Sequence, residues 1–374
     1  MEVQMRRRLY PLLITLSVLV AVETAAAANV EEEFETGALD RNRWCPCQIN
    51  EQKAPVTFSA DPDDARDWVA HITVDENSLG GNECRQEAPH LECGAPPAIA
   101  LMDETAIIET EAPDFLGPSL MAVTKPEWQP TPDRPDPYCN EQILERVKNG
   151  DEERQCIQRQ ELRLLPQFTH DAAIPHLYSM RFRMPKDVGD KTNSIRWVIA
   201  QWKQEPISGE YKKELGDDWG PSPFLAQRFD NGVLHVTVQD EHCRCMIASA
   251  PDRDGSTLQW NNGRPEYCQS TRPEDAQGKR CTPDLRVEYG QNPVLSSPAG
   301  NWIQMNYRVQ ADRSGTATIE INDGTRFIAR VTGKIGYEPK SGRSSKTKFK
   351  IGQYRDYMPF AETIDIDWVK ISVQ

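Results

Sequence analysis

The sequence predicts an all-β protein in which antiparallel strands form a two-sheet sandwich. Apolar and polar residues alternate in several segments, for example where Tyr178, Met180 and Phe182 are separated by polar side chains. Short apolar segments separated by Gly, Pro and Asn recur along the chain. Few long segments have helical spacing, and the exception, 141–163, predicts a short helix before a strand. Many short strands with such turns are typical of an antiparallel sandwich.

The expected strands share either strict alternation or a β-branched, nearly continuous apolar run. They cover 178–184, 197–202, 233–238, 316–321, 325–331, 349–354 and 364–371.

The two ends of the chain predict one domain. Phe34, Gly37, Leu39 and Asp40 form an F-x-x-G-x-L-D opening, a pattern common at the start of concanavalin-like jelly rolls. The segment 364–371 alternates as a half-buried closing strand should. We therefore expect a concanavalin-like β-jelly roll sandwich that spans 29–374.

The N-terminus has the three parts of a signal peptide. A cluster of arginines at 6–8 precedes an apolar run at 9–22, and small residues at 25–28 supply the A-x-A pattern of a cleavage site. The alternative is a membrane anchor, for which the run is short. We expect 1–28 to be removed, no membrane span afterwards, and a secreted or periplasmic protein.

Ten cysteines lie beyond residue 28. An even number in an exported protein predicts disulfide bonds, although the pairing is open. The alternative is a metal site, since Cys45-x-Cys47 and Cys243-x-Cys245 are closely paired; structural zinc sites usually space their cysteines by two to four residues. Two cysteine-containing ranges, the proline-rich 76–140 and the polar 240–292, are predicted to be disulfide-tied loop insertions.

The net charge of −14 argues against general nucleic-acid binding, which needs a basic surface. It does not exclude a polyanionic substrate, because a local basic site can lie on an acidic protein.

Three segments on expected strands carry residues suited to binding an anionic sugar. In Arg159-x-Glu161-x-Arg163, residues two apart share one face, so a carboxylate would hold two guanidiniums as a fork for an anion. The alternative is a solvated charged face. In Gln201-Trp202-Lys203, Gln201 and Lys203 share a face, and a buried Gln201 would need a polar partner from the protein or a substrate.

The third segment is 348–355, in which Lys350, Gly352 and Tyr354 share a face. The glycine would leave space above the backbone, and the lysine would favour the phenolate form of the tyrosine. A Tyr–Lys pair on a wet face is the alternative. Arg355, which follows, is a further candidate for binding substrate.

The order R-x-E-x-R, Q-W-x, K-x-G-x-Y and a closing D-x-D-x-V-x-I strand resembles the heparin lyase I-like polysaccharide lyases, which include glucuronan lyases. The resemblance runs from about Arg159 to Ile371, with Trp302 and the alternating strands after it in register. It implies a jelly roll whose groove binds an acidic polysaccharide and cleaves it by β-elimination.

The resemblance also assigns roles. Gln201, Arg159 and Arg163 would neutralise the uronate carboxylate, Tyr354 would act as base or acid, and Lys350 would support it. The family usually has histidine directly after Q-W, where this chain has Lys203. Lys203 is expected to act in the same site as an ammonium group, and among the histidines that remain, His235 is the candidate to face the groove.

Two other functions fit the same fold. A non-catalytic carbohydrate-binding protein is one, because the family histidine is missing. A glycoside hydrolase is the other, but it needs two positioned carboxylates, and no E-x-D-x-x-E motif is present. We expect a monomer that requires no cofactor. A structural calcium ion is an additional expectation, from Glu31–Glu33 near one end and Asp365 or Asp367 near the other, with plain surface acids as the alternative.

Overall fold

The computed structural model describes most of the sandwich and parts of the loops. The described residues are 29–40, 42–47, 56–61, 67–75, 78, 145–146, 148–149, 156–165, 173–188, 196–204, 222–240, 242–251, 268–270, 281–311, 316–336 and 347–374. The predicted signal peptide, residues 1–28, and Cys84, Cys93 and Cys139 lie outside them.

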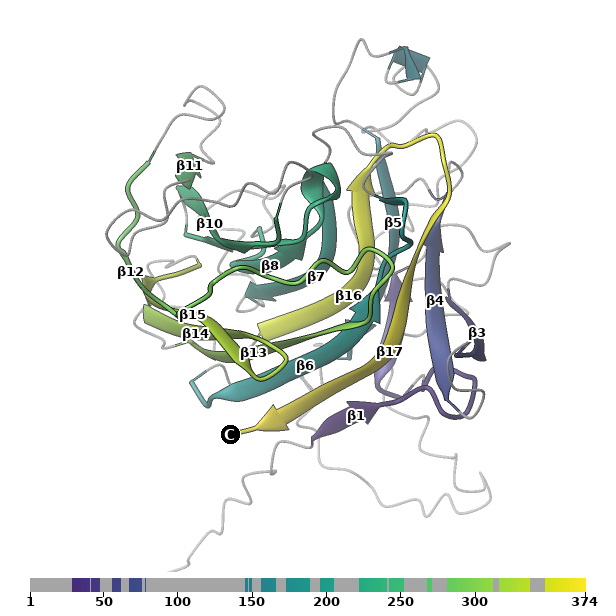
Figure 1. Cartoon of the computed structure of the whole chain (residues 1–374), viewed down its shortest axis with the longest axis horizontal. Coiled ribbons are helices and arrows are strands. Elements are labelled where there is room, and N and C mark those ends of the chain that lie inside the picture. The colour runs from purple at the N-terminus through teal and green to yellow at the C-terminus, as the bar shows by residue number, and fades with distance from the viewer. Residues whose placement is uncertain are drawn as a thin grey trace, which may run out of the picture.

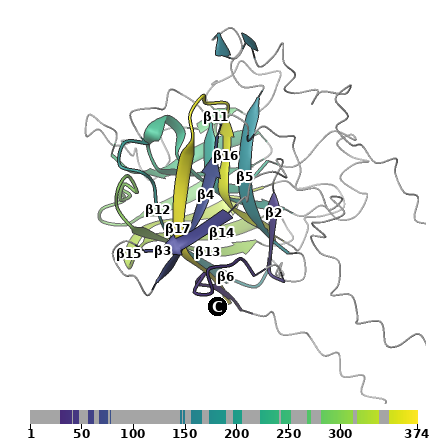
Figure 2. The same ribbon diagram turned by 90° about the vertical axis from the view of Figure 1, so that its right-hand side faces the viewer.

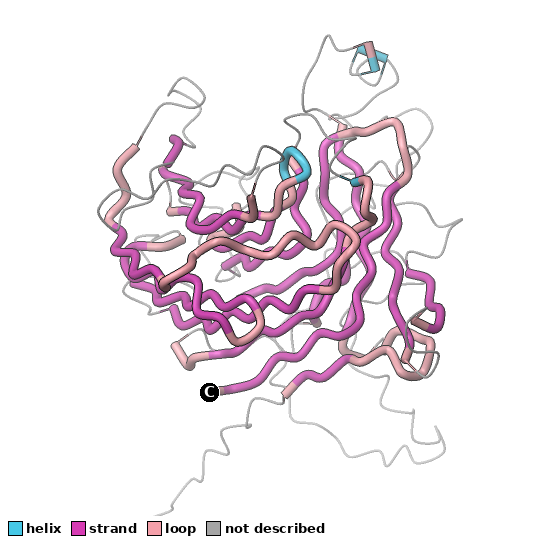
Figure 3. The backbone as a smooth tube through the Cα atoms, in the orientation of Figure 1, coloured by secondary structure: helices cyan, strands magenta, loops and turns pink. Residues whose placement is uncertain are grey.

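The regular secondary structure of the described chain is almost entirely strand and forms two antiparallel sheets, so the predicted all-β jelly-roll sandwich is confirmed (Figure 1; Figure 3, magenta). One nine-stranded sheet has the order β12-β15-β14-β13-β6-β17-β4-β3, with β1 also paired to β17. Its strands are β1 Val30–Glu32, β3 Val56–Ala60, β4 Trp68–Val74, β6 His176–Arg183, β12 Leu285–Tyr289, β13 Ile303–Ala311, β14 Thr316–Asp323, β15 Arg326–Lys334 and β17 Glu362–Val373.

The second sheet has eight strands in the order β11-β10-β9-β8-β7-β16-β5-β2. Its strands are β2 Trp44–Cys47, β5 Ile157–Leu164, β7 Trp197–Gln204, β8 Leu225–Arg228, β9 His235–Gln239, β10 Cys243–Ser249, β11 Cys268–Ser270 and β16 Thr347–Asp356. A 3₁₀ turn, η3, covers Asp230–Gly232 between β8 and β9.

The first and last described strands lie side by side. Val30 of β1 is opposite Ile371 of β17, and both side chains are buried. β17 also pairs with β4 and β6, which places it well inside the nine-stranded sheet. Figure 2 brings β3, β4 and β17 to the side that faces the viewer.

The core between the sheets contains a cluster of aromatic rings. Trp202 of β7 has its ring centroid 4.7 Å from Tyr307 of β13 and 5.0 Å from Phe349 of β16. Tyr178 of β6 completes the cluster, 5.3 Å from Phe349. Because side chains alternate along a strand, the neighbours of Trp202 and Phe349 in sequence point away from the core, to the outer face of the eight-stranded sheet.

The range 240–292 is tied by disulfides, as predicted, but it is not a pure loop. It supplies β10, β11 and β12, because Cys243, Cys245 and Ile247 alternate as buried residues within a polar sequence. Disulfides join Cys243 to Cys281 and Cys245 to Cys268.

Every cysteine whose side chain the structure describes is disulfide-bonded. Cys243 and Cys245 belong to two different bridges, which explains why the sulfurs of Cys243, Cys245 and Cys268 lie within 4.8 Å of one another. The zinc alternative for this pair is therefore excluded. Among the described residues no helix is long and apolar enough to cross a membrane.

Candidate functional site

The three predicted segments lie next to one another, because β16 pairs with β5 on one side and β7 on the other. Across the first pair, Tyr354 is opposite Arg159, and Lys350 is opposite Arg163. Across the second pair, Lys350 is opposite Gln201. We call the set Arg159, Glu161, Arg163, Gln201, Lys203, Lys350 and Tyr354 the polar cluster; it occupies the outer face of these three strands.

Glu161 is the centre of the polar cluster. Arg159 Nε donates to Glu161 Oε2 over 2.6 Å, Gln201 Nε2 donates to Oε1, and Lys350 Nζ lies 4.0 Å from Oε2. Burial raises the pKa of Glu161, but the charges of Arg159 and Lys350 and the bonds from Arg159 and Gln201 outweigh it and lower that pKa. Glu161 is therefore a permanent carboxylate that fixes three side chains.

Of the predicted fork, the contact between Arg159 and Glu161 is present, and Gln201 and Lys350 are the other neighbours of Glu161. The polar partner of Gln201 is Glu161, 3% exposed, where a substrate carboxylate was the other expectation. Arg159 is 2% exposed, and its Nη1 atom has no hydrogen-bond partner among the described residues. A buried guanidinium nitrogen without a partner is suited to an incoming anion.

Lys350 is buried beside this group. Burial lowers its pKa well below the usual lysine value, the charge of Arg159 lowers it further, and Glu161 partly opposes both. Lys203 and Lys348 also lower the pKa of Lys350. Lys203 is opposite Lys348, which stands two residues before Lys350 on β16.

Tyr354 is partly exposed at the edge of the polar cluster. The Arg159 guanidinium carbon lies 5.1 Å from the centroid of its ring, and that of Arg196 lies 5.2 Å from it. Arg196 is held by Asp356 through an ion pair. The ring of Tyr354 is therefore held between two guanidiniums.

Gly352 is required by the backbone. It has a φ of +134°, within a register shift between Ile351 and Tyr354, and a Cβ here would lie 2.4 Å from the carbonyl oxygen of Gln160. The predicted space above a glycine is therefore filled by β5. Because Gly352 has no side chain, β16 can approach β5 closely, and this approach brings Tyr354 beside Arg159.

His235 lies on the same outer face but not beside Tyr354. It is opposite Arg228 of β8, Arg228 is opposite Val198 of β7, and Val198 is opposite Tyr354. Three strand spacings, about 14 Å, separate the backbones of the two residues.

Both ring nitrogens of His235 face acceptors. Nδ1 donates to the carbonyl of Val233 over 3.0 Å, and Nε2 lies 3.4 Å from Asp230, which also binds Arg228 over 2.7 Å. Burial raises the pKa of Asp230, but Arg228 and His235 lower it below its usual value. His235 therefore does not take the place of the family histidine next to Gln201.

Arg355 is not part of the polar cluster, which corrects its assignment to substrate binding. Its side chain is 0% exposed on the opposite face of β16, where it donates to Gln158 over 2.7 Å and to the Phe360 carbonyl over 2.6 Å. Burial lowers the pKa of Arg355 to about 10. It follows Tyr354 directly, so the alternation of a strand turns it inward.

Arg196 and Asp356 were missed in the sequence. Asp356 stands two residues after Tyr354, which places it on the same face and was a usable signal. Arg196 adjoins Trp197 at the start of β7, and the sequence alone does not show that it reaches Tyr354 on the neighbouring strand.

Four of the acids proposed for calcium have cationic partners. Lys370 binds Glu31 over 2.6 Å and also binds Glu33. Asp365 pairs with His71 and Arg183, and Asp367 pairs with Arg181. They do not form one group of oxygen ligands.

No family model matches the chain, and no curated protein matches it. Solved structures do resemble it. An endo-β-1,4-glucuronan lyase from Trichoderma reesei is 12% identical with a TM-score of 0.33, covering 60% of this chain and 83% of that one. Alginate lyase A1-II′, of polysaccharide lyase family 7, is 14% identical with a TM-score of 0.28, over 58% and 72%.

A PL-14 alginate lyase from Aplysia kurodai is 7% identical with a TM-score of 0.32, over 86% of this chain and 87% of that one. The chain thus resembles jelly-roll polysaccharide lyases. The assignment of its site rests on the residues of the polar cluster.

Proposed function

We propose that the protein is an exported polysaccharide lyase that cleaves a uronate-containing acidic polysaccharide by β-elimination. The observation that carries the proposal is the gathering of Arg159, Gln201, Lys350 and Tyr354 on one outer face around a buried Glu161. Export is supported by the arginine-led apolar N-terminus and by the disulfides of the described cysteines, because such bonds persist in oxidising compartments.

The charges of the polar cluster fit an anionic sugar. Four cationic side chains, Arg159, Arg163, Lys203 and Lys350, accompany the single carboxylate of Glu161. The proton on the carbon next to a uronate carboxylate leaves only when the negative charge of that carboxylate is neutralised, and the unpartnered Nη1 of Arg159 is placed for this task.

Tyr354 is the group that exchanges protons with the sugar. In the elimination, a base removes the proton next to the carboxylate, a carbon–carbon double bond forms, and the bond to the glycosidic oxygen breaks. The leaving oxygen takes up a proton, so the reaction needs no co-reactant. Arg159 and Arg196 lie against the ring of Tyr354 and hold it in position, and Lys203 acts as an ammonium group that holds the substrate.

The polar cluster favours elimination over hydrolysis. A glycosidase needs a protonated carboxylic acid as its general acid, with a raised pKa. The pKa of Glu161 is lowered by Arg159 and Lys350, so Glu161 stays ionised and cannot donate a proton. A carbohydrate-binding protein without activity is the second candidate, because Lys203 stands where the family that the sequence resembles usually has histidine.

One experiment separates these functions. The mature protein is incubated with a panel of uronate polysaccharides, and the ultraviolet absorbance of the unsaturated product is followed, with binding measured in parallel. A lyase produces absorbance that grows with time on at least one polymer. Binding without any product would favour the carbohydrate-binding protein, and new reducing ends without absorbance would favour a hydrolase.

A further inference from the structure

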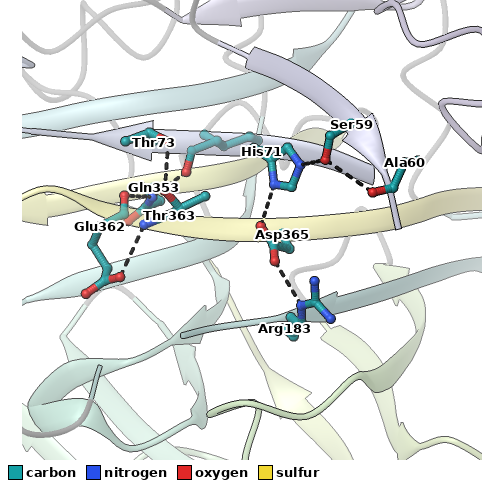
Figure 4. A network of polar contacts seen from close by, with 10 residues as sticks. Ser59, Ala60, His71, Thr73, Arg183, Gln353, Glu362, Thr363 and Asp365 are labelled. Atoms are coloured by element: carbon teal, nitrogen blue, oxygen red, sulfur yellow. Dashed lines mark hydrogen bonds and ion pairs between the residues drawn. The ribbon is translucent and has the colours of Figure 1, made fainter. Parts of the chain in front are cut away.

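A serine, a histidine and an aspartate form a chain of hydrogen bonds on the outer face of the nine-stranded sheet, away from the polar cluster (Figure 4). Ser59 Oγ of β3 lies 2.7 Å from His71 Nε2 of β4. His71 Nδ1 lies 2.7 Å from Asp365 Oδ1 of β17. This is the order of contacts through which a serine nucleophile is activated: hydroxyl to one ring nitrogen, carboxylate to the other.

The carboxylate end of this chain is fixed. Asp365 is directly opposite both His71 on β4 and Arg183 on β6, and Arg183 Nε donates to Asp365 Oδ2 over 2.9 Å. Burial raises the pKa of Asp365, but its bonds to His71 and Arg183 lower it overall, so it stays ionised. An ionised Asp365 holds the proton of His71 on Nδ1, which leaves Nε2 as the acceptor for the Ser59 hydroxyl.

The nucleophile end is accessible. Ser59 is exposed, whereas the side chains of His71 and Asp365 are 22% and 20% exposed. The Ser59 hydroxyl also lies 3.3 Å from the carbonyl of Ala60, a longer contact than that to His71. A substrate can therefore approach the hydroxyl without displacing a close partner other than the base.

A backbone donor lies next to the nucleophile. β3 is the last strand in the described order of its sheet. Asp61 N donates to Asp67 O, so Asp61 and Asp67 form a hydrogen-bonded pair of the antiparallel ladder. The neighbouring pair, Ala60 and Trp68, is therefore a non-hydrogen-bonded pair, in which the backbone N–H groups of both residues point away from the partner strand. The N–H of Ala60, the residue after the nucleophile, is thus directed off the edge of the sheet, where it can donate to the oxyanion of an attacked ester.

We propose that Ser59, His71 and Asp365 form a second, esterase site that hydrolyses small acyl esters on accessible substrates. Ser59 Oγ attacks the ester carbonyl carbon while its proton passes to His71 Nε2. The bond to the alcohol oxygen breaks, the alcohol leaves with that proton, and the acyl group stays on Ser59. A water molecule, deprotonated by His71, then releases the acid and restores the serine. Asp365 is the positioning residue for the ring.

The site is independent of the polar cluster, which belongs to the other sheet and shares no residue with it. A small acyl group suits the site because Ser59 is exposed on the last strand in the described order of its sheet. A larger acyl chain would have no surface of β3 to pack against.

The test uses the full mature protein and p-nitrophenyl acetate. We expect hydrolysis above the buffer rate and, on rapid quenching, the mass of one acetyl group on the peptide that contains Ser59. Ser59→Ala and His71→Asn should each lower the rate by about 10²-fold or more, the contribution of a positioned general base. Asp365→Asn should lower kcat more than it changes KM and should slow labelling of Ser59 by a fluorophosphonate.

The matched control is Thr73→Ala. The Thr73 and Thr363 hydroxyls lie 2.8 Å apart on the same two strands, but the pair contains no histidine. This variant should keep the full rate. An unchanged rate in Ser59→Ala, or acetyl and fluorophosphonate found on another residue, would overturn the proposal, and so would a wild-type rate equal to that of buffer. Because Ser59 is exposed, Ser59→Ala decides the outcome even if His71→Asn fails to fold.

Discussion

Replacing Glu161 by glutamine should destabilise the protein more than any surface charge change. The substitution keeps the shape of the side chain but removes the carboxylate that binds Arg159 over 2.6 Å and lies 4.0 Å from Lys350. Arg159 cannot lose its proton, so it would remain buried and unpaired at 2% exposure. Removing one partner of such a buried pair costs about 3–5 kcal/mol.

Urea denaturation with intact disulfides measures this loss. Glu320→Gln is the matched control, because Glu320 binds Arg330 across neighbouring strands over 2.8 Å with side chains 24% and 46% exposed. That exposed pair should contribute about 0–1 kcal/mol. If Glu161→Gln lost no more free energy of unfolding than Glu320→Gln, Glu161 would not be the counter-ion that organises the polar cluster.

Three further predictions concern stability. Gly352→Ala should lower the free energy of unfolding, measured by urea denaturation, more than Gly324→Ala does. Both glycines have positive φ, but a Cβ at Gly352 would lie 2.4 Å from a carbonyl oxygen, whereas a Cβ at Gly324 would meet open space. Equal losses of free energy in the two variants would contradict this. Replacing Cys245 and Cys268 together by serine should lower the free energy of unfolding by about 3 kcal/mol, as expected for a bridge of its loop length, and an unchanged urea midpoint would refute the bridge. Lys350 has a depressed pKa when folded, so the unfolded chain binds an extra proton between that value and about 10.4, and stability should rise with pH in this window. Lys350→Met should reduce that slope in urea titrations at several pH values, whereas an identical slope would show that Lys350 titrates normally.

The strands could be predicted because alternation is a local signal. Tyr178, Met180 and Phe182 are buried on β6 as their spacing of two predicts, and the segments that carry Arg159, Gln201 and Lys350 did lie on strands. The meeting of these three residues on one face was expected from the family resemblance, because parity acts only within a strand. Sequence could not give the strand order, which sets β16 between β5 and β7.

Other features depend on contacts between distant residues. His71 and Asp365 are 294 positions apart, and no spacing rule links them. The register shift at Gly352 cannot be predicted from a period-two pattern. The reason for a glycine at this position is the close approach of β5, which only the structure shows. Arg355 follows Tyr354 directly, so alternation along β16 places its side chain on the buried face, away from the polar cluster.

The most direct test of the proposed function is the elimination rate of Tyr354→Phe on a uronate polymer that the wild type cleaves. The variant loses one hydroxyl from a partly exposed ring and should fold normally, with Tyr289→Phe on β12 of the other sheet as the matched control. We predict that Tyr354→Phe loses at least about 10²-fold in the formation of the absorbing product while it still binds the polymer, and that Tyr289→Phe keeps the wild-type rate. Full activity in Tyr354→Phe would contradict the assignment of proton transfer to the polar cluster.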